Sequence, residues 1–161
     1  MWASIKKWAL GWLKGGPHFV VGDPSRPYLK RWYILPRNDW LCIYLHCFCR
    51  DDDDRALHDH PWDSASLILW GGYTEITADG AKDWKAGSLI RRTADFAHRI
   101  VLWRNRHGSP RKCWTLFITG PRKREWGFWC PQGWVHWKRF TAAGKPGEVG
   151  PGCEQEEHGN A

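Results

Sequence analysis

From residue 31 onward the sequence consists of short strand-like runs that are bounded by Gly, Pro, Asp or Asn. These runs cover residues 40–48, 64–70, 73–77, 88–92, 98–104, 113–119 and 134–140. Alternation is clearest in the first run, where side chains two residues apart share one face of a strand. Its two faces are Leu41, Ile43, Leu45 and Cys47 on one side and Cys42, Tyr44, His46 and Phe48 on the other. This punctuation predicts an all-β fold, an antiparallel sandwich or barrel, in one domain.

The two ends of the chain differ from this central part. Residues 1–30 read as an N-terminal amphipathic helix and a Pro-rich arm, because apolar residues recur at helical spacing and three prolines follow. The helix is too short and too charged to insert into a membrane, so it either lies on a membrane surface or packs against the barrel, which we favour. Residues 31–143 are then the barrel. Residues 144–161 lack apolar side chains to bury, so we predict a disordered tail.

The charge balance favours an anionic partner. Lys and Arg number 24 against 17 Asp and Glu, which gives a net charge of +7. The segment 141–161 carries a net charge of −3, so residues 1–140 carry +10. Such a body attracts small carboxylates, phosphates or nucleic acid. A solvated basic surface without a binding role explains the same charge equally well.

The six cysteines form no CxxC pair, and no secretory signal precedes them. We therefore expect reduced thiols and a cytoplasmic protein. The acidic run 51–54 lacks the spaced ligands and the glycine turn of a calcium loop. We interpret this run as a solvated turn that is salt-bridged to Arg50 and Arg55.

The sequence His58-Asp59-His60 is the first candidate for chemistry. Residues two apart on an extended strand point to the same side, so the two imidazoles can share one metal ion. The alternative is a structural pair of histidines in a turn, with Asp59 and Asp63 as hydrogen-bond partners. The spacing of the residues that follow decides between these two interpretations.

That spacing resembles the two motifs of the cupin superfamily, G(x5)HxH(x3)E(x6)G and G(x5)PxG(x2)H(x3)N. The first motif reads HDHPWDSASLILWG, from His58 to Gly71, and the second reads GSLIRRTADFAHRIVL, from Gly87 to Leu102. The spacings match throughout, but several identities differ. The positions at which this chain departs from the family pattern are Asp52, Ser64, Thr93, Asp95 and Leu102.

The resemblance, which covers roughly residues 40–120, implies a single cupin-type double-stranded β-helix (jelly-roll) barrel with a short N-terminal helix. It also implies that three of the family's four metal ligands are present, at His58, His60 and His98. For His98 alone, a hydrogen-bonded core histidine would be the better explanation, and its place in the second motif favours a ligand. The fourth ligand of the family, a glutamate, is replaced by Ser64, which binds such ions poorly.

Three neutral imidazoles suit one divalent ion, with Fe(II) preferred and Zn, Mn or Ni as alternatives, and they leave positions for water, substrate or dioxygen. Among cupins, a three-histidine iron centre is the arrangement of thiol dioxygenases. Asp63 and Glu75 are the nearest carboxylates that could replace the missing ligand, but Asp63 is out of register and Glu75 lies past the Gly71 turn. We therefore predict a divalent-metal-binding cupin, an Fe(II)-dependent dioxygenase that acts on a small anionic molecule.

Four residues are weaker candidates for binding that molecule. Ser64 occupies the family's carboxylate position, and Arg91, or its neighbour Arg92, can clamp a carboxylate bidentately at the barrel mouth. His46 and His136 lie on predicted strands beside aromatic residues, where a histidine can serve as an acid, a base or a hydrogen-bond partner. For each of these histidines, an ordinary hydrogen-bonded barrel residue is the alternative.

Other functions stay open at this point. A cupin can bind metal or a small ligand without redox chemistry, as an isomerase, a sensor or a structural module, so catalysis itself is undecided. The basic clusters 104–106 and 122–124 lie beside Trp103 and Trp126, which is compatible with a nucleic-acid-binding or assembly protein. We rank this third because no known nucleic-acid motif is present. A homodimer is a further open expectation.

Overall fold

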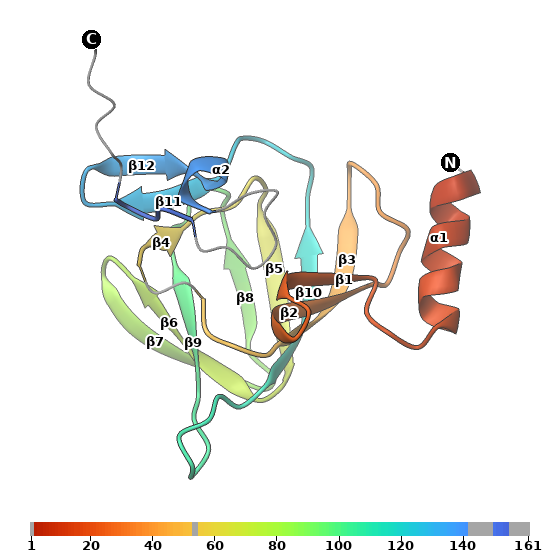
Figure 1. The fold of residues 1–161 in the computed structure, drawn as a ribbon, viewed down its shortest axis with the longest axis horizontal. Coiled ribbons are helices and arrows are strands. Elements are labelled where there is room, and N and C mark those ends of the chain that lie inside the picture. The colour runs from red at the N-terminus through yellow and green to blue at the C-terminus, as the bar shows by residue number, and fades with distance from the viewer. Residues whose placement is uncertain (1, 53–54, 142–149, 155–161) are drawn as a thin grey trace.

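The computed structural model describes residues 2–52, 55–141 and 150–154. Within these ranges the chain forms twelve strands and two helices (Figure 1). In chain order they are α1 (Trp2–Leu13), β1 (Phe19–Asp23), β2 (Arg26–Tyr33), β3 (Cys42–Phe48), β4 (Leu57–His58), β5 (Ser64–Trp70), β6 (Gly72–Thr77), β7 (Gly80–Lys85), β8 (Leu89–Arg92), β9 (Arg99–Leu102), β10 (Cys113–Thr119), β11 (Gly127–Cys130), β12 (Gly133–His136) and α2 (Trp137–Phe140).

The strands build two antiparallel layers that face each other (Figure 1). One layer is a six-stranded sheet in the order β1-β2-β3-β10-β5-β8. The other consists of two three-stranded ladders, β12-β11-β4 and β7-β6-β9. An isolated bridge between His58 and His98 joins these two ladders edge to edge. The prediction of an all-β barrel is therefore confirmed.

The main core fills the space between the layers, because both layers contribute apolar side chains to one buried cluster. The six-stranded sheet and the opposite ladder supply Leu29, Phe48, Ile68, Tyr73, Ile90, Ile100, Leu102 and Cys113. In β3 the buried face of the strand is the one that carries Tyr44, His46 and Phe48. A second, smaller cluster lies under β11, β12 and α2.

Two glycines that the sequence motifs single out have backbone conformations that require glycine. Gly71, between β5 and β6, has φ of 80°, and a Cβ there would lie 2.6 Å from the carbonyl oxygen of Lys112. Gly87, before β8, has φ of 89°. Because L-residues with a side chain rarely adopt positive φ, these positions fix where the strands turn. The spacing of the two glycines in the motifs therefore follows from the positions of these turns.

Several predicted runs coincide with observed strands, and one is half wrong. Runs 64–70 and 113–119 are β5 and β10. The run 134–140 ends as a strand at His136, after which α2 begins. The His136 side chain accepts a hydrogen bond from the backbone N–H of Lys138 and so starts a helical turn.

The Pro-rich arm is a β-hairpin rather than an irregular segment. Strands β1 and β2 pair with each other, and β2 pairs with β3, so the arm extends the six-stranded sheet. Pro27 lies opposite Gly22, next to the irregularity in register between Val21 and Gly22. A proline is tolerated at such a bulge because the ladder is already interrupted there. The proline content of the sequence therefore does not indicate that this segment forms two strands.

Helix α1 packs against the barrel, as favoured from the sequence. Both Trp8 and Trp12 donate from their indole Nε1 to the carbonyl oxygen of Tyr33, at 2.7 and 3.1 Å. His18 Nε2 lies 2.9 Å from the carbonyl oxygen of Trp8 and closes the junction between the helix and β1. Among the described residues, no helix is both long enough and apolar enough to cross a membrane.

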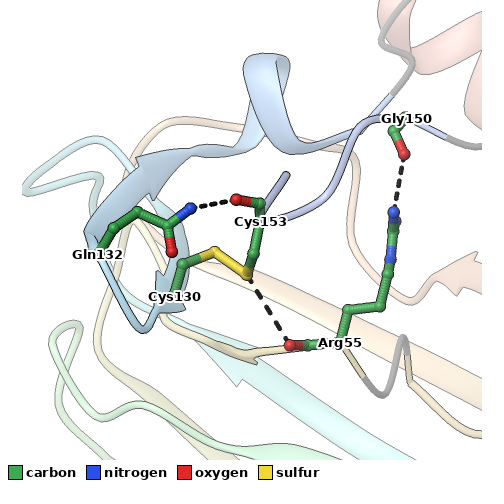
Figure 2. The surroundings of a disulfide bond; sticks show 5 residues. All are labelled: Arg55, Cys130, Gln132, Gly150 and Cys153. Atoms are coloured by element: carbon green, nitrogen blue, oxygen red, sulfur yellow. Dashed lines mark hydrogen bonds between the residues drawn. A yellow bond between two sulfur atoms is a disulfide. The ribbon is translucent and has the colours of Figure 1, made fainter. Parts of the chain in front are cut away.

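A disulfide between Cys130 and Cys153 corrects the expectation that all six cysteines are reduced thiols (Figure 2). The two residues are 23 positions apart in sequence, yet their Cα atoms are 5.5 Å apart. The other four cysteines are free. Only the fold brings this pair together, so no spacing rule in the sequence reveals it.

The same bond also corrects the prediction for part of the tail. Residues 150–154 lie against the barrel, whereas 144–149 and 155–161 fall outside the described residues. Arg55 Nη1 donates to the carbonyl oxygen of Gly150 at 2.7 Å, and Gln132 donates from its side-chain amide to the carbonyl oxygen of Cys153 (Figure 2). The segment is therefore held by a covalent bond and polar contacts, which an argument from apolar content alone does not detect.

Removing this disulfide is expected to destabilise the protein. By the loop-closure estimate, a loop of this length contributes about 3 kcal/mol to the free energy of unfolding. Cys153→Ser should therefore lower the Tm in a thermal melt without reductant, and reductant should lower the Tm of the unsubstituted protein in the same way. Cys49→Ser, at a half-buried free cysteine, serves as the control. Equal melting of all three proteins would contradict a stabilising disulfide.

Candidate metal site

The three histidines of the sequence motifs lie together where the two ladders of the second layer meet. His58 ends β4, and His98 immediately precedes β9. Their backbones pair, with His58 N–H donating to His98 O at 2.9 Å and His98 N–H donating to His58 O at 3.0 Å. His60 N–H donates to the carbonyl oxygen of Ala94 at 3.0 Å, which holds it beside the same segment. Backbone pairing therefore positions all three side chains.

The ring nitrogens are close enough to share one ion. One ligand nitrogen from each of His58, His60 and His98 lies within 4.8 Å of the other two, and the ring centroids are 5.0 to 5.2 Å apart. The Nε2 atoms of His60 and His98 are separated by 2.9 Å. Two imidazoles on one ion with metal–nitrogen bonds near 2.1 Å would have their nitrogens about 3 Å apart. The donor type fits a divalent transition metal, and the His60–His98 separation matches that of two ligands of one ion, so this cluster could hold one.

Two indole rings flank the cluster. The Trp62 ring centroid lies 5.2 Å from that of His60, and the Trp126 ring centroid lies 6.5 Å from that of His58. Both contacts are edge-on. These rings, together with Phe128 at 5.9 Å from His58, give the histidines an apolar surrounding.

Glu75 fixes the orientation of His98. Its Oε1 lies 2.6 Å from His98 Nδ1 and also accepts from Arg92 Nε at 2.6 Å, while Oε2 accepts from Trp84 Nε1 at 2.7 Å. With Nδ1–H donating to the carboxylate, the lone pair of His98 resides on Nε2, the atom that faces the other histidines. Glu75 was considered from the sequence as a replacement ligand. It contacts the outer nitrogen of a candidate ligand instead.

The electrostatics of this group favour neutral imidazoles beside an ionised carboxylate. Burial lowers the pKa of His98 to about 4, although its hydrogen bond to Glu75 opposes the fall. Burial and the neighbouring His58 and His98 hold the pKa of His60 well below its usual value. For Glu75, burial raises the pKa, but the hydrogen bond from His98 and the charge of Arg92 outweigh it and hold the pKa at about 2. Neutral imidazole is the form that binds a metal ion.

Asp59, between the two histidines of the HxH sequence, points to the opposite side and is fully buried. Its carboxylate accepts from the backbone N–H of Gly127 at 2.8 Å and from the indole N–H groups of Trp129 and Trp134 at 3.2 and 3.0 Å. It also pairs with Arg124 at 3.0 Å. These bonds attach the HxH segment to the β11–β12 hairpin, so Asp59 contributes to the position of both histidines.

The acidic run contributes to the fold, which corrects its interpretation as a solvated turn. Asp51 accepts from the backbone N–H of Leu102 at 2.8 Å, and Asp52 accepts from that of Ile100 at 2.5 Å. Asp52 Oδ2 also lies 3.8 Å from Nδ1 of His58. Residues 53–54 lie outside the described part of the chain. The first half of the run thus binds strand β9 and approaches the histidine cluster from its outer side.

The remaining carboxylate that the sequence offered is directed elsewhere. Asp63 accepts from the backbone N–H of Ala94 at 3.0 Å and pairs with Lys123 at 2.5 Å, so it is not among the residues around the histidines. Ser64 is buried on β5 and lines a cleft of about 420 Å³, with Arg91 and Thr93 on its other walls. The cleft does not include the three histidines.

The two candidate arginines have different environments. Arg91 is exposed and lies on the outer side of β8. Arg92 is buried, but its guanidinium is already matched by Glu75, at 2.5 Å, and also donates to the hydroxyl of Tyr73 at 3.2 Å. A role for Arg92 in holding Glu75 was not predicted. Arg92 lies on β8 and Glu75 on β6, which belong to different sheets, so no strand-pairing pattern in the sequence indicates this contact.

The two candidate histidines also differ. His46 is buried on the inner face of β3, where Arg31 Nε donates to its Nε2 at 2.9 Å. His136 lies at the end of β12, half-buried, with its Nε2 3.0 Å from a carboxylate oxygen of Glu125. The structure therefore places His46 inside the barrel and His136 away from the histidine cluster, at the start of α2.

No protein-family model matches this sequence, and no curated protein matches it either. The comparison with solved structures is informative about the fold.

A Ralstonia eutropha protein provisionally named a mannose-6-phosphate isomerase is 15% identical, covers 64% of this chain and 94% of its own, and has a TM-score of 0.50. A conserved Klebsiella pneumoniae protein with a double-stranded β-helix domain is 15% identical over 65% of this chain and 82% of its own, with a TM-score of 0.48. A cupin superfamily protein of Desulfitobacterium hafniense is 18% identical over 65% and 84%, with a TM-score of 0.46. The first of these likenesses shows a shared fold and nothing beyond the fold. The two antiparallel layers described above are the architecture that the motif resemblance implies.

Glu75→Gln is expected to weaken metal binding about 10- to 100-fold, since loss of the carboxylate removes the group that orients His98. Competition with a chelator of known affinity measures the change. Glu125→Gln is the matched control, because Glu125 also pairs with a histidine, His136, but away from the cluster. An unchanged affinity in Glu75→Gln, with circular dichroism showing a folded protein, would contradict the orienting role.

The metal-free protein is expected to lose stability as the pH falls from about 6.5 toward 4. In this interval the unfolded chain protonates His98 while the folded protein keeps it neutral, so the unfolded state binds more protons and the free energy of unfolding declines. Because one pKa unit corresponds to about 1.4 kcal/mol, the full loss from this residue is about 3 kcal/mol. Denaturant titrations between pH 7 and 5 measure the slope. In His98→Asn the free energy of unfolding should fall less steeply with decreasing pH. An unchanged dependence on pH would refute the assignment of this effect to His98.

Proposed function

We propose that this cupin-fold protein binds one divalent metal ion through His58, His60 and His98 and acts on a small anionic molecule that coordinates the ion. The observation that carries the proposal is the hydrogen bond of 2.6 Å between Glu75 and His98 Nδ1. A buried carboxylate that holds the outer nitrogen of a histidine is the usual partner of a metal-binding imidazole. Its presence beside a cluster of three imidazoles supports a metal site, in which the ion would replace the hydrogen bond of 2.9 Å that joins Nε2 of His60 and Nε2 of His98.

The residues have distinct roles in this proposal. The three imidazoles would hold the ion, which when bound supplies Lewis-acid or redox chemistry to a coordinated molecule. Glu75 and Arg92 keep His98 in one orientation and one tautomer. Asp59 anchors the HxH segment from the opposite side. Trp62 and Trp126 exclude water from the flanks of the cluster.

An anionic molecule is favoured by the charge of the site. Neutral imidazoles cancel none of the charge of a divalent ion, and the charge of Glu75 is already matched by Arg92. The carboxylate of Asp52 lies on the outer side of the cluster, 3.8 Å from His58 Nδ1, and offsets part of the ion's charge. Residues 1–140 add a net charge of +10 to the surroundings. Ser64, which stands where cupins carry a glutamate ligand, adds no negative charge. A carboxylate or a related anion would therefore bind with a larger electrostatic gain than a neutral molecule of the same size.

For the chemistry itself we propose an Fe(II)-dependent dioxygenase, because three imidazoles leave coordination positions for both substrate and dioxygen. The second candidate is a cupin that binds metal or a small ligand without redox chemistry, such as an isomerase. One of the similar structures carries an isomerase name, and at 15% identity that name describes the other protein. The identity of the bound metal separates the two candidates.

Metal content is expected to depend on each of the three histidines. The protein, expressed without a histidine tag, should contain about one equivalent of metal by elemental analysis, and His58→Ala, His60→Ala and His98→Ala should each lose it. The exposed His107→Ala is the control, and Ser64→Ala should retain metal because a neutral hydroxyl adds little beside three imidazoles. Full occupancy in folded His98→Ala would overturn the three-histidine assignment.

Oxygen uptake then tests the reaction class. Protein loaded anaerobically with Fe(II) is expected to consume dioxygen when small carboxylates or thiol-carboxylates are supplied, and the zinc-loaded protein is not. The neutral amides of the same compounds serve as the matched control, and no dioxygen consumption is expected with them. Two results together would favour the non-redox alternative. The purified protein would contain only zinc, and the iron-loaded protein would consume no dioxygen with any of the compounds tested.

A further inference from the structure

A second group of polar side chains lies inside the barrel, on the six-stranded sheet. Arg31, His46 and Thr115 are laterally paired on the adjacent strands β2, β3 and β10. Leu29 and Cys113, two positions before Arg31 and Thr115, belong to the buried core. Because residues two apart share a face of a strand, all three polar side chains face the interior. The metal site does not use them.

Arg31 has no counter-ion within the described residues. Its side chain is half-buried, its Nε donates to His46 Nε2 at 2.9 Å, and its guanidinium lies 4.7 Å from the ring centroid of Tyr44. Burial lowers the pKa of Arg31, although nearby tyrosines oppose the fall. A guanidinium taken partly out of water without a carboxylate is costly. The contrast is Arg92, whose buried charge is matched by Glu75.

His46 and Thr115 add hydrogen-bond donors that have no acceptor. Since Arg31 donates to Nε2 of His46, that nitrogen is the acceptor of the ring. Burial and the charge of Arg31 hold the pKa of His46 well below its usual value, so the ring is neutral and Nδ1 carries the hydrogen. Within the described residues, both this Nδ1 and the hydroxyl oxygen of Thr115 are buried without a partner. Buried donors normally have acceptors, so two such atoms on neighbouring strands need an explanation.

A continuous series of aromatic contacts connects this group with the histidine cluster. The His46 ring stacks on Phe117 with centroids 5.1 Å apart, Phe117 meets the edge of Trp62 at 6.2 Å, and Trp62 lies 5.2 Å from His60. The two polar groups therefore belong to one interior, separated by two aromatic rings. A molecule that contacts both groups would have to be long enough to pass these two rings.

We propose that Arg31, His46 and Thr115 form an anion subsite, which takes a carboxylate or phosphate group of the small molecule that binds at the three histidines. The inference rests on the proposed function and names the residues that select its anionic substrate. A guanidinium pairs with either oxyanion through two parallel N–H groups, and the imidazole N–H and the hydroxyl supply further donors. The subsite takes the role that the sequence assigned to Arg91, whose side chain is exposed.

The test measures anion binding by titration calorimetry, with malonate and inorganic phosphate as probes and malonamide as the neutral comparison. Arg31→Gln is expected to weaken binding of the preferred anion about tenfold or more, because it removes charge-assisted hydrogen bonds. Arg26→Gln, on the same strand but exposed, is the matched control and should bind as the unsubstituted protein does. The ratio of the dissociation constants for malonate and phosphate shows which oxyanion the subsite prefers.

A stability measurement separates a binding role from a structural one. Without an anion, Arg31→Gln is expected to raise the Tm, since it removes a half-buried charge that has no counter-ion. An arginine that serves the fold would give a lower Tm and an unchanged affinity, and that result would overturn the proposal. So would equal binding of malonate and malonamide, or loss of binding in Arg91→Gln but not in Arg31→Gln.

Both titrations are run on metal-free and metal-loaded protein. Failure of the unsubstituted protein to load metal would remove the proposed function while leaving anion binding at Arg31 measurable. Absence of anion binding at about 10 mM in both forms, with metal loading intact, would remove the subsite alone. The two proposals therefore fail in distinguishable ways.

Discussion

The pair of backbone hydrogen bonds between His58 and His98 is the interaction on which the rest of the site depends. These two bonds, of 2.9 and 3.0 Å, join the ladder that contains β4 to the ladder that contains β9. A shift of this pairing by one residue would turn the side chains to the other face of the sheet. The same contact therefore closes the second layer of the barrel and brings two imidazoles from distant parts of the sequence together.

Buried charge is arranged differently at the two polar groups of the interior. Around Glu75 the structure matches every charge, with Arg92 as the counter-ion and indole and imidazole N–H groups on the remaining lone pairs. Such a network is rigid, which suits a group that must hold His98 in one orientation. Around Arg31 the donors exceed the acceptors. The first group is therefore held rigidly, whereas the second has hydrogen-bond donors without acceptors among the described residues.

Much of the fold could be predicted from the sequence, because strand alternation and turn glycines are local properties. The three histidines were expected from the resemblance to the cupin motifs, since His98 lies far from His58 and His60 in the sequence. Alternation gave the strands, and the spacing of Gly71 and Gly87 reflects turns that need positive φ. Features that depend on pairing across the fold escaped prediction. Two of these features join segments that are distant in the sequence, namely the disulfide of Cys130 and the contact of Glu75 with His98. The third is the inward position of Arg31, which follows from the pairing of β2 with β3. The proline-rich hairpin was missed for a different reason, since Pro27 lies opposite an irregularity in the register, where a proline does not disrupt the pairing.

The indole rings beside the histidine cluster have a consequence for how the protein can be observed. Trp62 and Trp126 lie within 5.2 and 6.5 Å of imidazoles, ring centroid to ring centroid. Ions with unpaired electrons, such as high-spin Fe(II) or Mn(II), quench the emission of a nearby indole, whereas zinc with its filled d shell does not quench by this route. The emission of these two indoles, among the fourteen of the chain, would therefore report which ion is bound, with no added dye or label.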